Sequence, residues 1–206
     1  MPRASAYSWR PINYSPMRKT ALLFLLLLAS GLLQAQPFVK LQSGDLLFVS
    51  DTSGMGQAVK ESTGQYTHVA MVERVGNSLF IIDATQKRGV ARRPIENTFA
   101  NKMSVEVYRL TIPFDTAAVL ARAHELLGKP YDNAFLPDND AYYCSELIQA
   151  VFDTLFPSAP MNWRDKEDKL PEYWKKHFEN LGIPVPEGFL GTNPTDMSRS
   201  PLLRKL

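Results

Sequence analysis

The sequence predicts an α+β fold in which an antiparallel sheet packs against helices. Segments with strand-like alternation occupy residues 44–110, and segments with helical periodicity follow from residue 115. The two kinds of segment do not alternate as they would in a parallel α/β sheet. A Gly-Asn pair at 76–77 separates two strand-like segments and is typical of a tight turn between antiparallel strands.

The first half of the chain contains short apolar and β-branched runs bounded by turn residues, which is the pattern of strands. The run GDLLFVS predicts a turn and a buried strand, and MSVEVYRL alternates strictly. The predicted strands lie at 44–50, 67–75, 78–85, 88–94 and 103–110, with a short helix at 54–62.

Three segments of the second half predict helices. The first covers 115–128, with an aspartate at its start as N-cap and a glycine at its end as stop signal. The second covers 143–156. The third covers 171–182, with proline at its start and glycine at its end. The remaining residues, 183–206, are rich in Pro, Gly, Ser and Asn and predict ordered coil.

The N-terminal segment has the layout of a secretory signal peptide. In RKTALLFLLLLASGLLQAQ, two basic residues precede an apolar run from Ala21 to Leu33, and small and polar residues follow. We expect a signal peptide over residues 1–35, with translation starting at Met17. The alternative is a retained membrane anchor, but the apolar run is shorter than the roughly 20 residues of a membrane span.

Removing this leader changes the charge balance. The leader carries four basic and no acidic residues, so 19 basic and 21 acidic residues remain, a net charge of −2. We assign residues 37–206 to a single domain, which is long enough for a proper core. The absence of a dense basic patch argues against nucleic acid as a partner. We expect an exported protein, periplasmic or extracellular, with no stable membrane span after leader cleavage.

Cys144 is the only cysteine of the chain and lies at the start of the predicted helix 143–156. An odd cysteine in an exported protein indicates an intermolecular disulfide or a free thiol. Cys144 shares a helix face with Leu147 and Ile148, which favours a small packed hydrophobe. Its place in the first turn favours a thiolate, because helix N-termini stabilise anions and lower thiol pKa values. The residues alone leave both interpretations open.

A nucleophilic cysteine needs a base, and the chain offers three histidines. We expect His124 to be a helix-surface residue and His177 a solvated side chain on a charged helix. His68 opens the apolar strand THVAMV, where it is either a packed core residue or a rigidly placed base. Asp83, on the returning strand, is either a strand-end residue or the group that orients the imidazole. Glu73 is another candidate for that role, but it falls towards the hairpin turn.

A set of motifs follows in order across residues 41–156: GDLLF, THVAMVE, IIDA before a GV, GKPYD and YYCSELI. Together they resemble the permuted papain-like amidases of the YiiX and YaeF kind, within the NlpC superfamily of cysteine peptidases. NPTDM at 193–197 is similar to the ending of that family. The histidine strand precedes the cysteine helix, which fits a circular permutation, because a triad is recognised by geometry and not by chain order.

The resemblance implies a circularly permuted papain-like (NlpC-type) fold, with an antiparallel sheet or a small barrel packed against helices. It implies Cys144 as nucleophile, His68 as general base and Asp83 as the orienting residue, where relatives often carry glutamate. The backbone N–H of Cys144 would form part of an oxyanion hole. Tyr131 and Tyr143 would flank the cleft, either binding substrate or simply packing. No metal or other cofactor is expected, since the chain has no Cys/His cluster with zinc spacing.

The resemblance makes an exported cysteine amidase or peptidase the main functional hypothesis, acting on a small peptide or peptidoglycan fragment through a thioacyl-enzyme. One alternative is a lipid-directed acyltransferase or hydrolase with the same triad, which predicts an apolar channel near Cys144. Another is a non-catalytic envelope binding module. That module predicts a packed thiol which resists alkylation until the protein unfolds.

Overall fold

The computed structural model describes residues 40–206 except 97 and 99–103. The predicted signal peptide and the predicted start at Met17 lie outside the described residues. Residues 41–206 form one compact unit. In this described part of the chain, the helices are too short or too polar to cross a membrane.

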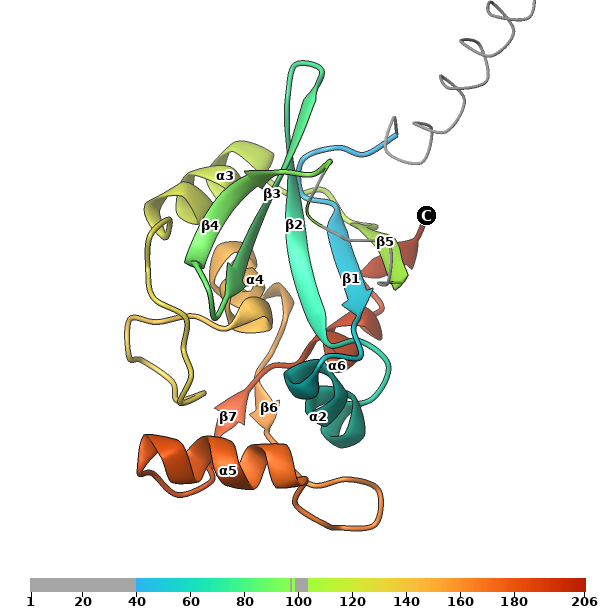
Figure 1. Ribbon diagram of the computed structural model, residues 1–206. Helices are drawn as coiled ribbons and strands as arrows, with labels where there is room; N and C mark the ends of the chain where they lie inside the picture. Colours follow the sequence, from blue (N-terminus) through green and yellow to red (C-terminus); the bar gives the residue numbers. More distant parts are fainter. Residues whose placement is uncertain (1–39, 97, 99–103) are drawn as a thin grey trace, which may run out of the picture. The chain divides into compact units, whose positions relative to one another are not determined.

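An antiparallel sheet of six strands forms the centre of this unit (Figure 1). Its strands are β1 (Leu46–Ser50), β2 (His68–Val75), β3 (Ser78–Thr85), β4 (Gly89–Pro94), β5 (Ser104–Leu110) and β8 (Leu203–Lys205). The strand order is β4-β3-β2-β1-β5-β8. Among the described strands, β4 and β8 are the two edges, so the sheet is open. The predicted antiparallel sheet is confirmed, and the small barrel is not formed.

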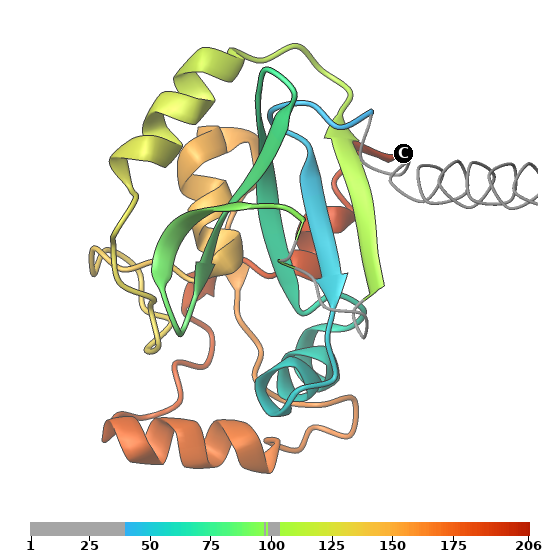
Figure 2. The same cartoon turned by 45° about the horizontal axis from the view of Figure 1, so that its top comes forward.

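The helices of the unit are α2 (Gly54–Thr63), α3 (Thr116–Glu125), α4 (Cys144–Phe152), α5 (Glu172–Leu181) and α6 (Pro194–Ser198). Helix α4 packs against β2 and β3, and α3 packs against α4, so both cover one face of the sheet (Figures 1 and 2). Helix α2 contacts α5 beyond one end of the sheet. A short ribbon of β6 (Ala159–Pro160) and β7 (Leu190–Gly191) lies next to α5 (Figure 1).

The predicted hairpin at Gly76 and Asn77 is confirmed. Val75 pairs with Ser78 across the turn, and Gly76 takes a positive φ of 59°. Such a backbone conformation is easy for glycine and suits a two-residue turn. The hairpin therefore fixes which residues of β2 and β3 face each other.

Two predicted helices end earlier than expected. Helix α3 begins as predicted, because the Asp115 carboxylate accepts a hydrogen bond from a first-turn N–H, but it stops before Gly128. Gly128 instead donates its N–H to the Val90 carbonyl of β4 at 2.9 Å. Helix α4 ends at Phe152, because Asp153 adopts a positive φ of 55° and the chain continues as a 3-10 turn.

The prediction of coil for residues 183–206 was wrong. This segment contains β7, α6 and β8. Helix α6 is capped by Asn193, whose side-chain oxygen accepts the N–H of Asp196 at 2.8 Å. Strand β8 joins the main sheet, with Leu203 opposite Leu110 of β5. The C-terminal segment is therefore part of the structural framework.

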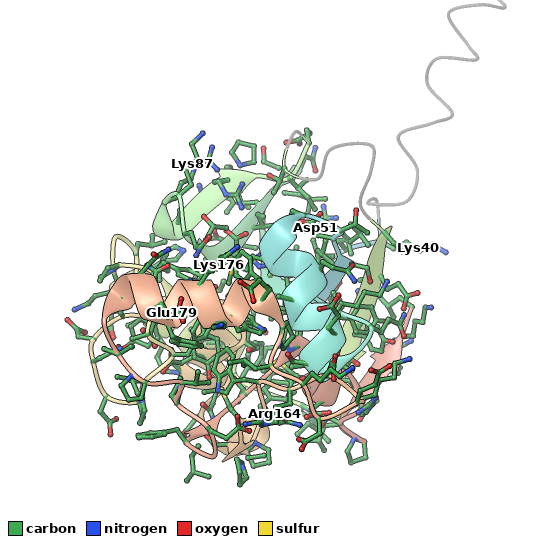
Figure 3. All side chains as sticks on the ribbon, turned by 60° about the horizontal axis from the view of Figure 1, so that its bottom comes forward. Lys40, Asp51, Lys87, Arg164, Lys176 and Glu179 are labelled. Carbon is green, nitrogen blue, oxygen red and sulfur yellow. The ribbon has the colours of Figure 1, made fainter. Side chains whose placement is uncertain are left out.

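Two hydrophobic clusters meet at the start of α4. The first lies between the sheet and α3 and α4 and contains Cys144. The second is aromatic, lies under α2 and α5, and contains Tyr143. In α5, Trp174 faces this second cluster and is 1% exposed, whereas the charged side chain of Lys176 lies on the solvent side (Figure 3). The N-terminus of α4 thus sits where the two clusters adjoin.

Candidate active site

Cys144 is the first residue of α4, with Tyr143 as the N-cap. The cysteine is unpaired and 7% exposed. Both sequence interpretations describe its position correctly, since it packs in the core and also lies in the first helical turn. The first N–H groups of a helix have no intrahelical partner, and the helix dipole favours negative charge there. The position therefore suits a thiolate and the oxyanion of an acyl-transfer intermediate.

His68 and Asp83 face each other across the hairpin. Nε2 of His68 lies 2.9 Å from Oδ2 of Asp83, with side-chain exposures of 21% and 1%. His68 is the first residue of β2, and Asp83 lies near the end of β3. Diagonal neighbours on one face of an antiparallel pair are within reach of long side chains. The sequence expectation that Asp83 lies beside His68 therefore matches the geometry.

Glu73 does not take part in this arrangement. Its carboxylate accepts one hydrogen bond from Nε of Arg92 at 2.5 Å and pairs with His124 at 3.0 Å. Glu73 lies further along β2, towards the turn, so it serves a separate ion-pair cluster.

His68 and Cys144 line the same cavity. Because Nε2 is engaged by Asp83, Nδ1 is the ring nitrogen left for the thiol. Burial alone would lower the pKa of His68, but the hydrogen bond with Asp83, the neighbouring Cys144 side chain and their negative charges raise it above its usual value. His68 is thus hydrogen-bonded to Asp83 and shares a cavity with Cys144.

Arg93 is a component that the sequence analysis missed. Its Nη2 donates to Oδ1 and Oδ2 of Asp83 at 2.8 and 2.5 Å. Burial alone would raise the pKa of Asp83, but the hydrogen bonds from His68 and Arg93 and their charges lower it. Asp83 pairs in register with Ala91, and Arg93 lies two positions further along β4, on the same face. Extending the hairpin register to the predicted strand 88–94 would have revealed it.

Two cavities adjoin Cys144. The first, of about 280 Å³, we call the histidine-side cavity. Its characteristic lining residues are Asp51, His68, Asp83, Thr85, Gln86 and Arg93. The second, of about 300 Å³, we call the aromatic cavity. Its characteristic lining residues are Phe135, Tyr143, Met161, Trp163 and Trp174. Cys144 lines both cavities, so the thiol lies between a compartment that contains charged side chains and one that has aromatic side chains in its wall.

The two tyrosines named from the sequence both line cavities beside Cys144. Tyr131 lines both, and burial together with the negative charges of Cys144 and Asp132 raises its pKa well above the usual value. Its phenol therefore stays neutral and can donate a hydrogen bond. Tyr143 lines the aromatic cavity, and burial is the main reason that its pKa rises to about 12. Its hydroxyl accepts the N–H of Thr192 at 2.9 Å.

The other two histidines have different partners. His124 has a half-exposed side chain that pairs with Glu73, in agreement with its predicted place on a helix surface. His177 is not a solvated side chain as predicted. It is half-buried, donates from Nε2 to the Asn133 carbonyl at 2.7 Å and stacks on Tyr173.

A cysteine at a helix start, facing a histidine on an antiparallel strand, is the arrangement of papain-like cysteine hydrolases. The model of a family described as permuted papain-like amidase enzyme, YaeF/YiiX, C92 family, matches residues 40–206, and the chain belongs to that family. The family resemblance inferred from the sequence motifs is confirmed. Membership of this family makes the chain a cysteine hydrolase.

A solved structure supports the same fold. The crystal structure described as that of the metalloprotein YiiX from Escherichia coli O157:H7 aligns with a TM-score of 0.66 and 23% sequence identity. The alignment covers 80% of this chain and 96% of that chain. No curated protein matches the chain. In the described part of the present chain, no group of three or more His, Cys, Asp or Glu side chains is arranged to hold a metal ion.

Proposed function

We propose that Cys144, His68 and Asp83 form the catalytic triad of an exported amidase, which hydrolyses an amide bond in a small peptide such as a peptidoglycan fragment. One observation carries this proposal: His68 hydrogen-bonds with Asp83 and lines one cavity together with Cys144, which lies at a helix start that adjoins two cavities. The exported location rests on the signal-peptide layout of residues 1–35.

The reaction begins when Nδ1 of His68 takes the thiol proton of Cys144. The thiolate attacks the amide carbonyl carbon, and the N–H groups at the start of α4 stabilise the resulting oxyanion. The imidazolium then gives its proton to the amine nitrogen as the C–N bond breaks. Water, deprotonated by His68, attacks the thioester, and the carboxylic acid leaves as the thiol re-forms. Asp83 holds the ring in place and stabilises the imidazolium.

The first test is the rate of Cys144 alkylation by iodoacetamide as a function of pH. The wild type should react rapidly well below pH 8.5, the region where an ordinary cysteine becomes a thiolate, and His68→Ala should lose that low-pH reactivity. His124→Ala is the matched control, because His124 also pairs with a buried carboxylate but lies apart from Cys144. A thiol that is inert in the folded protein, with no effect of His68→Ala, would overturn the triad and favour the binding module.

A lipid-directed activity of the same triad is the second candidate. Its support is the set of aromatic side chains in the aromatic cavity beside Cys144, which a fatty acyl chain could contact. Comparison of a peptide amide with a fatty-acyl amide as substrates, each checked with Cys144→Ala, separates the two candidates.

A further inference from the structure

The two cavities beside Cys144 correspond to the two sides of the scissile bond, if the triad acts as proposed. The protonated imidazole must reach the leaving amine, so the leaving group lies on the side of His68. His68 lines the histidine-side cavity and not the aromatic cavity. The acyl group, which stays on the cysteine after the amine departs, therefore extends into the aromatic cavity.

The aromatic cavity is not simply apolar. Three of its lining residues carry a buried polar atom that has no hydrogen-bond partner among the described residues: Oγ of Ser145, Oγ1 of Thr192 and Nε1 of Trp174. The residues are 0%, 9% and 1% exposed. They come from α4, from the segment after β7 and from α5, and so from distant parts of the chain. Buried polar groups are nearly always paired, so three unpaired ones around one cavity indicate a ligand that pairs with them.

The chemistry of these three groups defines what fits. The indole N–H of Trp174 can only donate, and the hydroxyls of Ser145 and Thr192 can donate or accept. A peptide-type amide offers a carbonyl acceptor and an N–H donor, which complements such a set. A plain alkyl chain would fill the cavity but leave all three groups unpaired. A site built to hydrogen-bond its substrate discriminates strongly against an analogue that lacks the polar group.

The size of the cavity agrees with a single residue. At about 30 Å³ for a water-sized group, its 300 Å³ holds about ten such groups. This is the scale of one acylated apolar residue.

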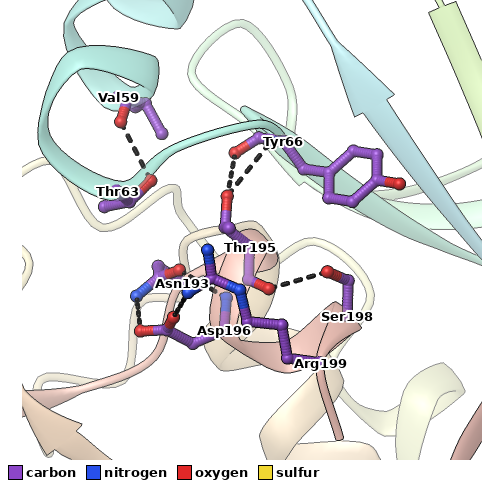
Figure 4. A network of polar contacts seen from close by, with 8 residues as sticks. All are labelled: Val59, Thr63, Tyr66, Asn193, Thr195, Asp196, Ser198 and Arg199. Atoms are coloured by element: carbon purple, nitrogen blue, oxygen red, sulfur yellow. Dashed lines mark hydrogen bonds and ion pairs between the residues drawn. The ribbon is translucent and has the colours of Figure 1, made fainter.

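The walls of the cavity are held in place by hydrogen bonds. On the α6 side, Thr195 accepts the N–H of Tyr66 at 3.0 Å through Oγ1, two residues before His68 (Figure 4). Asn193 and Asp196, which line the cavity, are joined by the helix cap at 2.8 Å (Figure 4). The pocket wall and the segment that leads to the histidine are therefore tied together, as a preformed subsite requires.

We infer that the aromatic cavity is the acyl-side subsite, and that it selects an apolar aminoacyl group through both its side chain and its adjoining amide. This inference rests on the proposed function and specifies it further. It names an N-acylated apolar amino acid or peptidyl amide as the substrate class, in preference to a fatty-acyl amide.

The test uses two 4-nitrophenyl esters with the same leaving group. One is the ester of N-acetyl-phenylalanine, and the other is its isostere in which isobutyl replaces acetamido. We expect the wild type to hydrolyse the acetamido ester with the higher kcat/KM. Thr192→Val and Ser145→Ala should each reduce that preference about three- to tenfold, as expected for one neutral hydrogen bond. Trp174→Phe, which removes the indole N–H, should have a similar effect.

Thr85→Val is the matched control. Thr85 also carries a buried, unpartnered hydroxyl among the described residues, but it lines the histidine-side cavity. Its substitution should leave the preference between the two esters unchanged. Hydrolysis of both esters at equal rates, abolished by Cys144→Ala, would overturn the inference and leave the triad standing. If neither ester is hydrolysed in a Cys144-dependent manner, the proposed function fails and the inference with it.

Discussion

The histidine-side cavity and the aromatic cavity share Cys144, yet they are built in different ways. The first is lined by neighbouring strands, and its charged groups are paired: Asp83 with His68 and Arg93, and Asp51 with Ser53. The second is assembled from helices and from the C-terminal segment, and it retains unpaired polar groups. The contrast is one of degree, since Oγ1 of Thr85 and Nε of Arg93 in the histidine-side cavity also have no partner among the described residues. What distinguishes the first cavity is its paired carboxylates, and what distinguishes the second is its aromatic wall.

Replacement of His68 should produce the largest loss of activity, because it removes the proposed general base from the histidine-side cavity. His68→Ala is expected to lower kcat/KM by about 10²- to 10⁴-fold, the usual contribution of a general acid–base group. Steady-state kinetics on the N-acetyl-phenylalanine ester measures this loss. A loss of the same size in His124→Ala would contradict the distinct role of His68.

The packing of the aromatic cluster can be disrupted by a substitution that leaves His68 unchanged. Phe178 of α5 is 1% exposed in the aromatic cluster, and Phe178→Ala should lower the free energy of unfolding by about 3–5 kcal/mol. Urea unfolding measures the change. Leu181 lies on the same helix but is 42% exposed, so Leu181→Ala should change stability by only about 0.5 kcal/mol.

In folded Phe178→Ala, the pH profile of Cys144 alkylation should remain that of the wild type, since the contacts of His68 are intact. A shifted profile would show that the two sides are not independent.

Substitution of Arg93 tests how a neighbouring positive charge affects Asp83 in the histidine-side cavity. Arg93 helps to lower the pKa of Asp83, so Asp83 acts as a carboxylate until the pH falls through that lowered value. Without Arg93 the pKa of Asp83 rises, and the loss of activity on acidification should begin about one pH unit higher. The profile of kcat/KM against pH for Arg93→Met measures the shift. Arg92→Met is the matched control, because Arg92 pairs with Glu73 instead.

Glu146 should give the smallest effect. It lies in the first turn of α4, and burial together with Asp132 and Asp138 raises its pKa from 4.5 to about 8. The folded state therefore holds a proton that the unfolded chain has lost, and stability falls as the pH rises from 4.5 to about 8.

Glu146→Gln removes this titration and keeps an acceptor for the N–H of Tyr143. The variant should be more stable than the wild type by about 1 kcal/mol above pH 8, with no difference below pH 4.5. Urea unfolding at several pH values measures the difference, and a gain that does not depend on pH would contradict this explanation.

The histidine-side cavity is the part of the site that the sequence predicts well. The two-residue turn at Gly76 and Asn77 sets the β2–β3 register, and that local signal brings His68 and Asp83 together. The placement of Cys144 at a helix start follows from the apolar stripe of α4. Arg93 was missed because its role depends on carrying the register across a second strand pair.

The aromatic side was not predictable in the same way. Its lining extends from Met55 to Asp196, and no local pattern shows that these segments meet. The pairing of Leu110 with Leu203 likewise joins residues far apart in sequence, so the tail looked like coil. An open sheet and a small barrel differ only in whether the two edge strands pair with each other. The alternation of residues within a strand does not predict that pairing.

The position of α6 and β8 near the end of the chain has a consequence for the order in which the parts of the site are synthesised. A ribosome makes the strand of His68 and the helix of Cys144 well before it makes residues 190–205, which supply β7, α6 and β8. The nascent chain thus carries Cys144 and His68 while one wall of the aromatic cavity is still missing. A chain that ends before residue 190 would therefore retain Cys144 and His68 but lack β7, α6 and β8, and with them part of the lining of the aromatic cavity.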